Sequence, residues 1–435
     1  MNIKAKHLLI AIFGVLVLFH RCSPVKRLAI QRDVGSIVNK SPIFQDEYLG
    51  LSIYDPYQEQ YLVDINADKY FTPASNTKLL TLYASLLTLQ DSIPTFAYRR
   101  TRDSLILLPL GDPTFLHRDF SSQRTLERIK TVLGDRKVFV QYPNIELEAY
   151  GPGWSWDDFG YPFQTERNQM PIYGNVVTVE QTAQTAIIPD FFQDYVELTS
   201  ENPARRRDRN QNVFRFQLKS EEEDTVTQAS PFINSSELLL RLLSDTLDTD
   251  VRSVQTSLGF QDTLYNGPTL PMTALMMLRS DNFLAEQMLY MAAVQKRSGS
   301  IPAFIETLKS EDMNFTPDPL VWVDGSGLSR YNMFTPRSMV TLLHRIYRRM
   351  DWEQIEVVFP TGGVSGTIRK WYGAETPYVF AKTGTLRHNH CLSGFIQTKS
   401  GKTLIFSFMN NHYTRPGSEI KQEMQTLLEK IRDSY

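Results

Sequence analysis

The stretch Thr72-Pro-Ala-Ser-Asn-Thr-Lys78 stands between two different sequence patterns and decides the interpretation of the fold. Before it, residues 51–55 and 61–65 read as two strands joined by a polar connection, which predicts a hairpin. After it, apolar residues recur at helical spacing, and its proline suits the first turn of a helix. The stretch therefore predicts a helix that carries Ser75 and Lys78 in its opening turns.

Residues 96–234 differ from the rest of the chain in their amino-acid composition. They are rich in β-branched and aromatic residues with Pro, Gly and charged interruptions, and they hold one clear helical stretch, 123–133. We expect an inserted, mainly β accessory domain here.

The second half of the chain returns to helical and then to strand-like patterns. The helical stretches are 236–245, 272–295, 336–349 and 419–431, and the strand-like runs are 378–385, 391–396 and 403–409. A hairpin near the start and strands near the end predict one antiparallel sheet that both ends of the chain build and that helices cover, an α+β fold. The main domain is therefore expected to be discontinuous, with residues 30–95 and 235–435 on either side of the insertion 96–234.

The composition is that of an ordinary folded protein. The chain has 435 residues, 42% of them apolar, and a net charge of −2. Its length favours two or more structural units. The basic run 205–209 is followed by the acidic run 221–224, which indicates solvated, balanced loops rather than a nucleic-acid surface.

The N-terminus has the layout of an export signal. Lys4 and Lys6 precede twelve apolar residues, 8–19, which is short of the about 20 that a membrane span needs. Residues 1–22 are thus predicted to be a signal peptide or an N-terminal anchor, with the protein in the periplasm or cell envelope. Cys22 stands where a lipoprotein cysteine would stand, and the sequence leaves open whether this end is cleaved, lipidated or retained.

Three short motifs occur in order: Ser75-Asn-Thr-Lys78, Ser280-Asp-Asn282 and Lys382-Thr-Gly384. Two of them are weak singly, because Ser23-Pro-Val-Lys26 and Ser200-Glu-Asn202 match the same patterns. The third motif occurs once and lies in a predicted strand. The ordered set, with each motif in a suitable element, indicates an active-site serine enzyme.

The spacing of the first motif has a direct chemical use. Residues i and i+3 on a helix share a face, so the Lys78 amine can approach the Ser75 hydroxyl. Serine becomes a good nucleophile when a neighbour removes its proton, and an ammonium cannot do so. The pKa of Lys78 must therefore fall from about 10.4 to about 7, roughly 4 to 5 kcal/mol, which we expect burial and a second cation such as Lys382 to supply.

The other two motifs suit substrate handling. Ser280 and Asn282 are expected to hold Lys78 and to relay a proton to the leaving amine, with Asn282 also bonding the substrate's backbone amide. Lys382 lies beside a glycine that lets a ligand backbone come close, so it suits a terminal carboxylate, with Thr383 as a hydrogen-bonding partner. Without a catalytic role, Ser75 would be an ordinary serine at the start of a helix, Ser280 and Asn282 would be exposed polar residues on a helix, and Lys382 would be a charged residue on an edge strand. The occurrence of all three motifs in order argues against this alternative.

The sequence resembles a known family in these motifs and in four further phrases. The phrases are Gly111-Asp-Pro113, Pro152-Gly-Trp-Ser-Trp-Asp-Asp158, Asp324-Gly-Ser-Gly-Leu-Ser-Arg330 and Gly366-Thr367. The family is that of the low-molecular-mass class C penicillin-binding proteins, D-alanyl-D-alanine carboxypeptidases and endopeptidases of the DacB type. The resemblance implies a penicillin-binding/β-lactamase-like transpeptidase domain that hydrolyses D-Ala-D-Ala or D-Ala-diaminopimelate bonds of peptidoglycan peptides without a cofactor or metal, and that β-lactams inhibit covalently.

The resemblance also implies roles for single residues. Ser75 would be the acylated nucleophile and Lys78 the general base, with Ser280 and Asn282 as the second active-site element. Residues Lys382, Thr383 and Gly384 would form the third element.

Two further roles follow from the resemblance. The oxyanion hole would be the backbone N–H groups of Ser75 and Thr385. An acidic residue of the insertion would read the diaminopimelate amine; Asp158 is the match, with Asp157 as a competitor and a plain surface carboxylate as the alternative. The insertion is shorter than in long family members, and the glycine run before Gly111 is reduced, which leaves the insertion's architecture open.

Several alternatives stay open. A serine β-lactamase or esterase has the same motifs and would turn over a chromogenic β-lactam rapidly, whereas a catalytically idle peptidoglycan-binding protein would not acylate. His388 and His390 lack a third ligand at suitable spacing, so no metal site is predicted. The glycines around Ser326 predict a turn near the active-site rim, not a nucleophile elbow. The oligomeric state and the balance of the two peptidase activities are not predicted.

Overall fold

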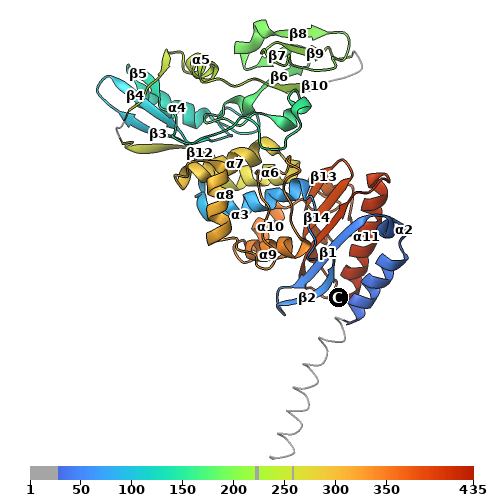
Figure 1. Ribbon diagram of the computed structural model, residues 1–435. Helices are drawn as coiled ribbons and strands as arrows, with labels where there is room; N and C mark the ends of the chain where they lie inside the picture. Colours follow the sequence, from blue (N-terminus) through green and yellow to red (C-terminus); the bar gives the residue numbers. More distant parts are fainter. Residues whose placement is uncertain (1–27, 221–224, 257–258) are drawn as a thin grey trace, which may run out of the picture. The chain divides into compact units, whose positions relative to one another are not determined.

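The computed structural model describes residues 28–220, 225–256 and 259–435, and it consists of two compact units (Figure 1). Among the described residues, the terminal unit comprises 28–73 and Phe334–Tyr435, and the middle unit lies within Ala74–Met333. The predicted signal segment 1–22 lies outside the described residues. In the part of the chain that is described, no helix is long and apolar enough to cross a membrane.

The terminal unit contains a five-stranded sheet in the order β13-β14-β15-β1-β2. Its strands are β1 Tyr48–Asp55, β2 Gln60–Ile65, β13 Val379–Leu386, β14 Asn389–Gln397 and β15 Thr403–Asn411. Every neighbouring pair is antiparallel, and β1 pairs with both β2 and β15. The predicted hairpin and the predicted sheet from both ends of the chain are thus confirmed.

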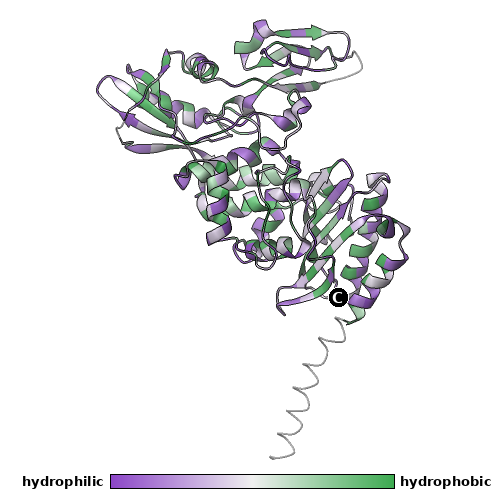
Figure 2. Ribbon diagram, in the orientation of Figure 1, coloured by the Kyte–Doolittle hydropathy of each residue, from purple (hydrophilic) through white to green (hydrophobic). Residues whose placement is uncertain are grey.

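Helices cover this sheet on both faces. The helical segments are 28–40, α2 Pro42–Asp46, α9 Pro336–Tyr347, α10 Trp352–Val358, the short η6 Gly366–Ile368 and α11 Gly417–Ser434. All nine residues of β15 are buried, and because alternate residues of a strand point to opposite faces, both faces must be covered. One core joins the sheet to 28–40, α2 and α11, while α9 contacts β1, β14 and β15. Hydrophobic residues are green on these strands in Figure 2 and alternate with hydrophilic ones along α11.

The helices of the middle unit position two of the three motifs. The helical elements that carry these motifs or contact α7 are η1 Ala74–Thr77, α3 Lys78–Thr88, α6 Thr269–Arg279, α7 Asn282–Gln295 and α8 Ile301–Glu311. Helix α7 is buried without interruption from Phe283 to Ala293, including the polar Glu286 and Gln287, and it packs on α3.

The predicted helical stretch 272–295 is two helices, because the chain breaks at Ser280. This residue ends α6 in the left-handed conformation with φ 58°, and Asp281 begins α7 by accepting a hydrogen bond from Leu284 N. The apolar periodicity runs across the break, which conceals it in the sequence.

Three sheets make up the rest of the middle unit, in the orders β11-β5-β4-β3-β12, β10-β6-β7 and β8-β9. The strands are β3 Ser92–Arg100, β4 Ser104–Pro109, β5 Lys137–Val140, β6 Val176–Gln181, β7 Thr185–Ile188, β8 Val196–Thr199, β9 Phe214–Gln217, β10 Val226–Pro231, β11 Val251–Ser253 and β12 Asp262–Pro268. The helices are α4 Gln123–Leu133 and α5 Ser236–Leu247, and the short turns are η2 Trp156–Asp158, η3 Pro162–Gln164, η4 Tyr173–Asn175 and η5 Asp190–Tyr195. The expected region 96–234 is mainly β with the one helix predicted in it, and its largest sheet also takes in β11 and β12, which follow residue 234.

Gly394 tests how closely the strands β13 and β14 of the terminal sheet pack. A Cβ there would overlap the Phe380 carbonyl and lie 2.6 Å from the Ala381 Cα, so the backbone must shift. We expect Gly394→Ala to lower the free energy of unfolding by about 1–3 kcal/mol, measured as a shift of the urea midpoint. The matched control is Gly35→Ala in the helix 28–40, where nothing lies within 4 Å and alanine should stabilise by about 0.5–1 kcal/mol. An unchanged midpoint for Gly394→Ala would contradict this packing.

Candidate active site

The middle unit brings Lys78 together with residues of two motifs and a distant loop. Lys78 is completely buried at the start of α3. Its Nζ lies 3.0 Å from Ser75 Oγ, 2.6 Å from Asn282 Oδ1 and 2.7 Å from the Ser326 carbonyl oxygen. The first and second motifs are therefore in direct contact through the lysine amine.

The local conformation of the first motif explains how Ser75 meets Lys78. The prediction placed both residues in one α-helix, but Ser75 lies in the 3₁₀ turn η1, and Lys78 is the first residue of α3. The meeting survives this difference because residues i and i+3 also align in a 3₁₀ turn. The Thr77 hydroxyl donates to the Ala74 carbonyl at 2.8 Å and closes the turn.

The break between α6 and α7 orients Asn282. Its side-chain nitrogen donates to the Phe163 carbonyl at 2.8 Å, which leaves its oxygen as the acceptor for Lys78. Ser280, two residues earlier, is half-buried at the end of α6. The second motif thus stands at a helix junction rather than on an exposed helix face.

Burial determines the electrostatics of the site. It lowers the pKa of Lys78 to about 8, against the opposing charges of Asp281, Asp324 and Glu286. A neutral amine has two protons and one lone pair. The Asn282 oxygen and the Ser326 carbonyl can only accept, so they take the two protons and leave the lone pair for the Ser75 hydroxyl.

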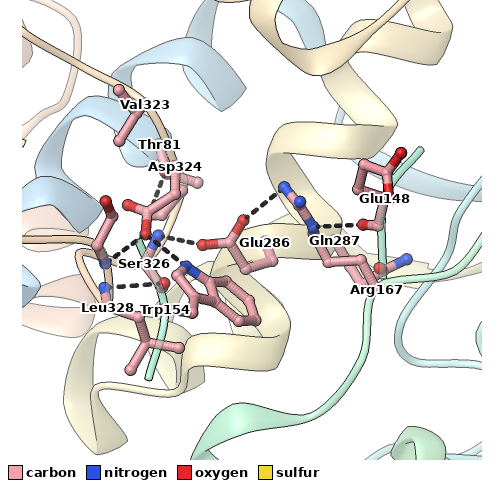
Figure 3. Close-up of polar contacts among 12 residues, drawn as sticks. Thr81, Glu148, Trp154, Arg167, Glu286, Gln287, Val323, Asp324, Ser326 and Leu328 are labelled. Atoms are coloured by element: carbon pink, nitrogen blue, oxygen red, sulfur yellow. Dashed lines mark hydrogen bonds and ion pairs between the residues drawn. The ribbon is translucent and has the colours of Figure 1, made fainter. Parts of the chain in front are cut away.

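The loop that supplies the Ser326 carbonyl is buried and rich in hydrogen bonds (Figure 3). Asp324 accepts from Gly327 N at 2.9 Å, from Ser329 N at 2.7 Å and from Trp154 Nε1 at 2.9 Å. The glycines form a turn, as predicted, and within it Asp324 and Ser326 are fully buried. The sequence did not reveal that this turn would contact Lys78.

The third motif belongs to the terminal unit, on the edge strand β13. Lys382 is buried, and its Nζ donates to the Thr383 carbonyl at 2.8 Å. The Thr383 hydroxyl lies 2.7 Å from the Thr367 hydroxyl, and Gly384 is buried next to them. The effect of Lys382 on Lys78 stays a prediction.

Thr385 is exposed, and the neighbouring strand fixes its side chain. The Thr385 hydroxyl lies 2.8 Å from His390 Nδ1. Burial, together with the charges of Lys421 and Lys382, lowers the pKa of His390 to about 3, so this imidazole is neutral. The His388 Nδ1 lies 2.9 Å from the Tyr413 carbonyl oxygen. Among the described residues, no group of three or more His, Cys, Asp or Glu side chains is arranged to hold a metal ion.

Asp158 lies in the segment that reaches the second motif. It ends the turn η2 and is half-buried, and burial, followed by the charge of Asp157, raises its pKa. Five residues later, the Phe163 carbonyl accepts from Asn282. The structure therefore brings the segment of Asp158 to the site, and the contact itself is made by the Phe163 backbone.

Known proteins resemble this chain over nearly its whole length. The D-alanyl-D-alanine carboxypeptidase DacB of Haemophilus influenzae is 25% identical, with 93% of each chain covered. The crystal structure of penicillin binding protein 4 (dacB) from the same species has a TM-score of 0.69 at 22% identity and covers 92% of this chain and 99% of its own. The predatory endopeptidase Bd3459 of Bdellovibrio bacteriovorus has a TM-score of 0.52 at 17% identity and covers 88% and 92%.

The two solved structures confirm the predicted fold class. The model of the D-Ala-D-Ala carboxypeptidase 3 (S13) family matches residues 30–431, which is most of the chain. The protein is therefore a member of the D-Ala-D-Ala carboxypeptidase 3 (S13) family, as its DacB-type motifs indicated.

Proposed function

We propose that this serine-type carboxypeptidase hydrolyses the terminal D-Ala-D-Ala bond of peptidoglycan peptides through an acyl-enzyme on Ser75. The observation that carries the proposal is the buried Lys78 amine, 3.0 Å from Ser75 Oγ with two further acceptors around it. The family membership and the name of the Haemophilus relative support the same bond as the substrate.

The reaction has two steps. In the first, Lys78 takes the Ser75 proton while Oγ attacks the carbonyl carbon of the penultimate D-alanine. The proton then passes, with Ser280 as the relay, to the nitrogen of the terminal D-alanine, whose C–N bond breaks. In the second step, water gives a proton to Lys78 and attacks the ester, and Ser75 regains its proton as the acyl group leaves.

The third motif would bind the substrate's free end. Lys382 is proposed to attract the terminal carboxylate, with Thr383 as a hydrogen-bonding partner and Gly384 leaving room for the peptide backbone. The N–H groups of Ser75 and Thr385 would stabilise the oxyanion of the tetrahedral intermediate. The hydrogen bond between neutral His390 and the Thr385 hydroxyl supports a fixed Thr385 in this role.

The place of action would be the cell envelope, where peptidoglycan is found. Residues 1–22 would direct export to the periplasm and, if retained, would attach the protein to the membrane. We also propose that the insertion 96–234, between the two parts of a catalytic domain 30–95 and 235–435, sets the preference for crosslinked substrates. A second, endopeptidase activity on D-Ala-diaminopimelate crosslinks is part of this proposal, because the resemblance to the DacB-type family implies it.

Labelling with a fluorescent penicillin tests the acyl-enzyme. We expect one covalent adduct, found by mass spectrometry on the peptide containing Ser75. The label should be lost completely in Ser75→Ala, because Ser75 is the nucleophile that Lys78 activates in the proposed mechanism. Ser200→Ala, which removes the serine of the decoy Ser200-Glu-Asn202 pattern, should label like the unaltered protein.

The outcomes separate the alternatives. A folded protein that takes no label on Ser75 with several β-lactams would favour the idle peptidoglycan-binding protein and refute the proposal. Rapid turnover of a chromogenic β-lactam, with no release of D-alanine from pentapeptide, would favour a β-lactamase instead.

Asp158 tests the endopeptidase activity. If its carboxylate binds the diaminopimelate amine, Asp158→Asn should lower kcat/KM on crosslinked muropeptides by about 10-fold, as loss of a charge-assisted hydrogen bond does. The release of D-alanine from a peptide whose lysine side chain is acetylated should not change, because that peptide has no free side-chain amine. The neighbouring Asp157→Asn is the matched control, and an equal loss in that variant would remove the assignment to Asp158.

A further inference from the structure

Two successive peptide groups of the loop 324–329 are hydrogen-bonded at both ends. In the Gly325–Ser326 peptide, the carbonyl accepts from Thr81 Oγ1 at 2.7 Å and the N–H donates to Glu286 Oε1 at 2.7 Å. In the Ser326–Gly327 peptide, the carbonyl accepts from Lys78 Nζ and the N–H donates to Asp324 Oδ1 at 2.9 Å. Both peptides therefore have a donor from α3 on one side and a carboxylate on the other.

The spacing of α3 fits this arrangement. Lys78 and Thr81 are three residues apart and lie on one face of the helix, so they meet consecutive carbonyls of the loop. On the other side, Glu286 comes from α7 and Asp324 from the loop itself. Figure 3 shows Glu286 and Asp324 directed at the backbone near Ser326.

Two glycines allow the loop to pass close to the backbone of α7 and of η1. A Cβ on Gly325 would lie 2.7 Å from the Ala285 carbonyl oxygen of α7. A Cβ on Gly327, where φ is +83°, would overlap the Ala74 carbonyl oxygen beside Ser75. The loop is thus in contact with the helices that carry both motifs of the middle unit.

The carboxylates of Glu286 and Asp324 are connected through two residues from the segment before α5, Arg167 and Trp154. Arg167 Nη1 lies 3.5 Å from Glu286 Oε2, and the two side chains are 5% and 1% exposed. The Arg167 guanidinium lies 5.5 Å from the centre of the Trp154 ring, and Trp154 donates to Asp324. Glu286, Arg167, Trp154 and Asp324 therefore form a continuous chain of contacts, and the two carboxylates at its ends both accept hydrogen bonds from the loop.

We propose that Glu286 is a positioning residue for the acylation step: it holds the Ser326 amide so that the Ser326 carbonyl accepts a proton of Lys78 and the amine's lone pair faces Ser75. The inference rests on the proposed function and adds a residue to it. Asp324 holds the adjoining peptide in the same way, and Arg167 keeps Glu286 in place from the segment before α5.

The Glu286 carboxylate also acts on the Lys78 amine through its charge. The charged groups around it are Arg167, Asp324 and Lys78, with Asp281 at the start of its own helix. Burial and then Asp324 raise the pKa of Glu286, while Arg167 opposes the rise. The carboxylate in turn raises the pKa of Lys78, so removing its charge should lower that pKa further.

The experiment measures the rate constant of Ser75 acylation by fluorescent penicillin between pH 6 and 10. The unaltered protein should gain rate with pH with a midpoint near 8, as Lys78 loses its proton. Glu286→Gln keeps an acceptor for the Ser326 amide but no charge, so we expect a lower midpoint and a plateau rate within a few-fold. Glu286→Ala removes the acceptor as well, and its plateau should fall by about 10- to 100-fold, as small displacements of catalytic groups cause.

Gln287→Ala is the matched control. Gln287 is the next residue of α7 and bonds both the N–H and the carbonyl of Asn168, so it supports the same segment as Glu286 without touching the loop 324–329. It should lower the thermal midpoint of unfolding while leaving the pH midpoint of acylation unchanged. If an unpaired Arg167 prevents folding of Glu286→Gln, the double variant with Arg167→Met removes the buried pair together and gives the same readout.

Three results would overturn the inference: a wild-type pH midpoint in Glu286→Gln, a wild-type plateau in folded Glu286→Ala, or an equal pH shift in Gln287→Ala. Absence of label in the unaltered protein would instead refute the proposed function. The two failures are therefore distinguishable.

Discussion

The burial of one amine is the constraint on which the site depends. Lys78 is completely enclosed, and burial lowers its pKa to about 8, so an appreciable part of it is neutral near pH 7. The three acids in its surroundings act in the opposite direction. The balance leaves an amine that can accept a proton from Ser75 and, once charged, is still stabilised by nearby carboxylates.

The orientation of the Lys78 lone pair matters as much as the charge of the amine. A neutral lysine can act as a base toward Ser75 only if its lone pair points there, and Asn282 and the Ser326 carbonyl fix this by taking the two protons. Asn282 is held in turn by the Phe163 carbonyl, and the loop of Ser326 is held by Glu286 and Asp324. Phe163, between the first and second motifs, and Glu286 and Asp324, after the second, therefore support the groups around Lys78.

The sequence predicted the fold and the contact of the first two motifs, because both depend on local periodicity and on the i, i+3 spacing of Ser75 and Lys78. It did not predict the break at Ser280, since apolar periodicity continues across it. It also missed Glu286 and the Ser326 carbonyl, because a backbone oxygen has no sequence signature. The one available signal was an acid next to an amide, Glu286-Gln287, inside an otherwise apolar helix, and sequence alone does not say which buried group such a pair will meet.

A direct titration of Lys78 tests the account most sharply. The full-length protein would be labelled with ¹³C at the lysine Cε positions, and the Lys78 signal would be assigned by its loss in Lys78→Met. We expect the Lys78 amine to titrate near pH 8 in the free protein, well apart from exposed lysines near 10.4. A Lys78 signal that titrates with the exposed lysines would contradict the account, because the amine would then be fully charged at neutral pH and unable to activate Ser75.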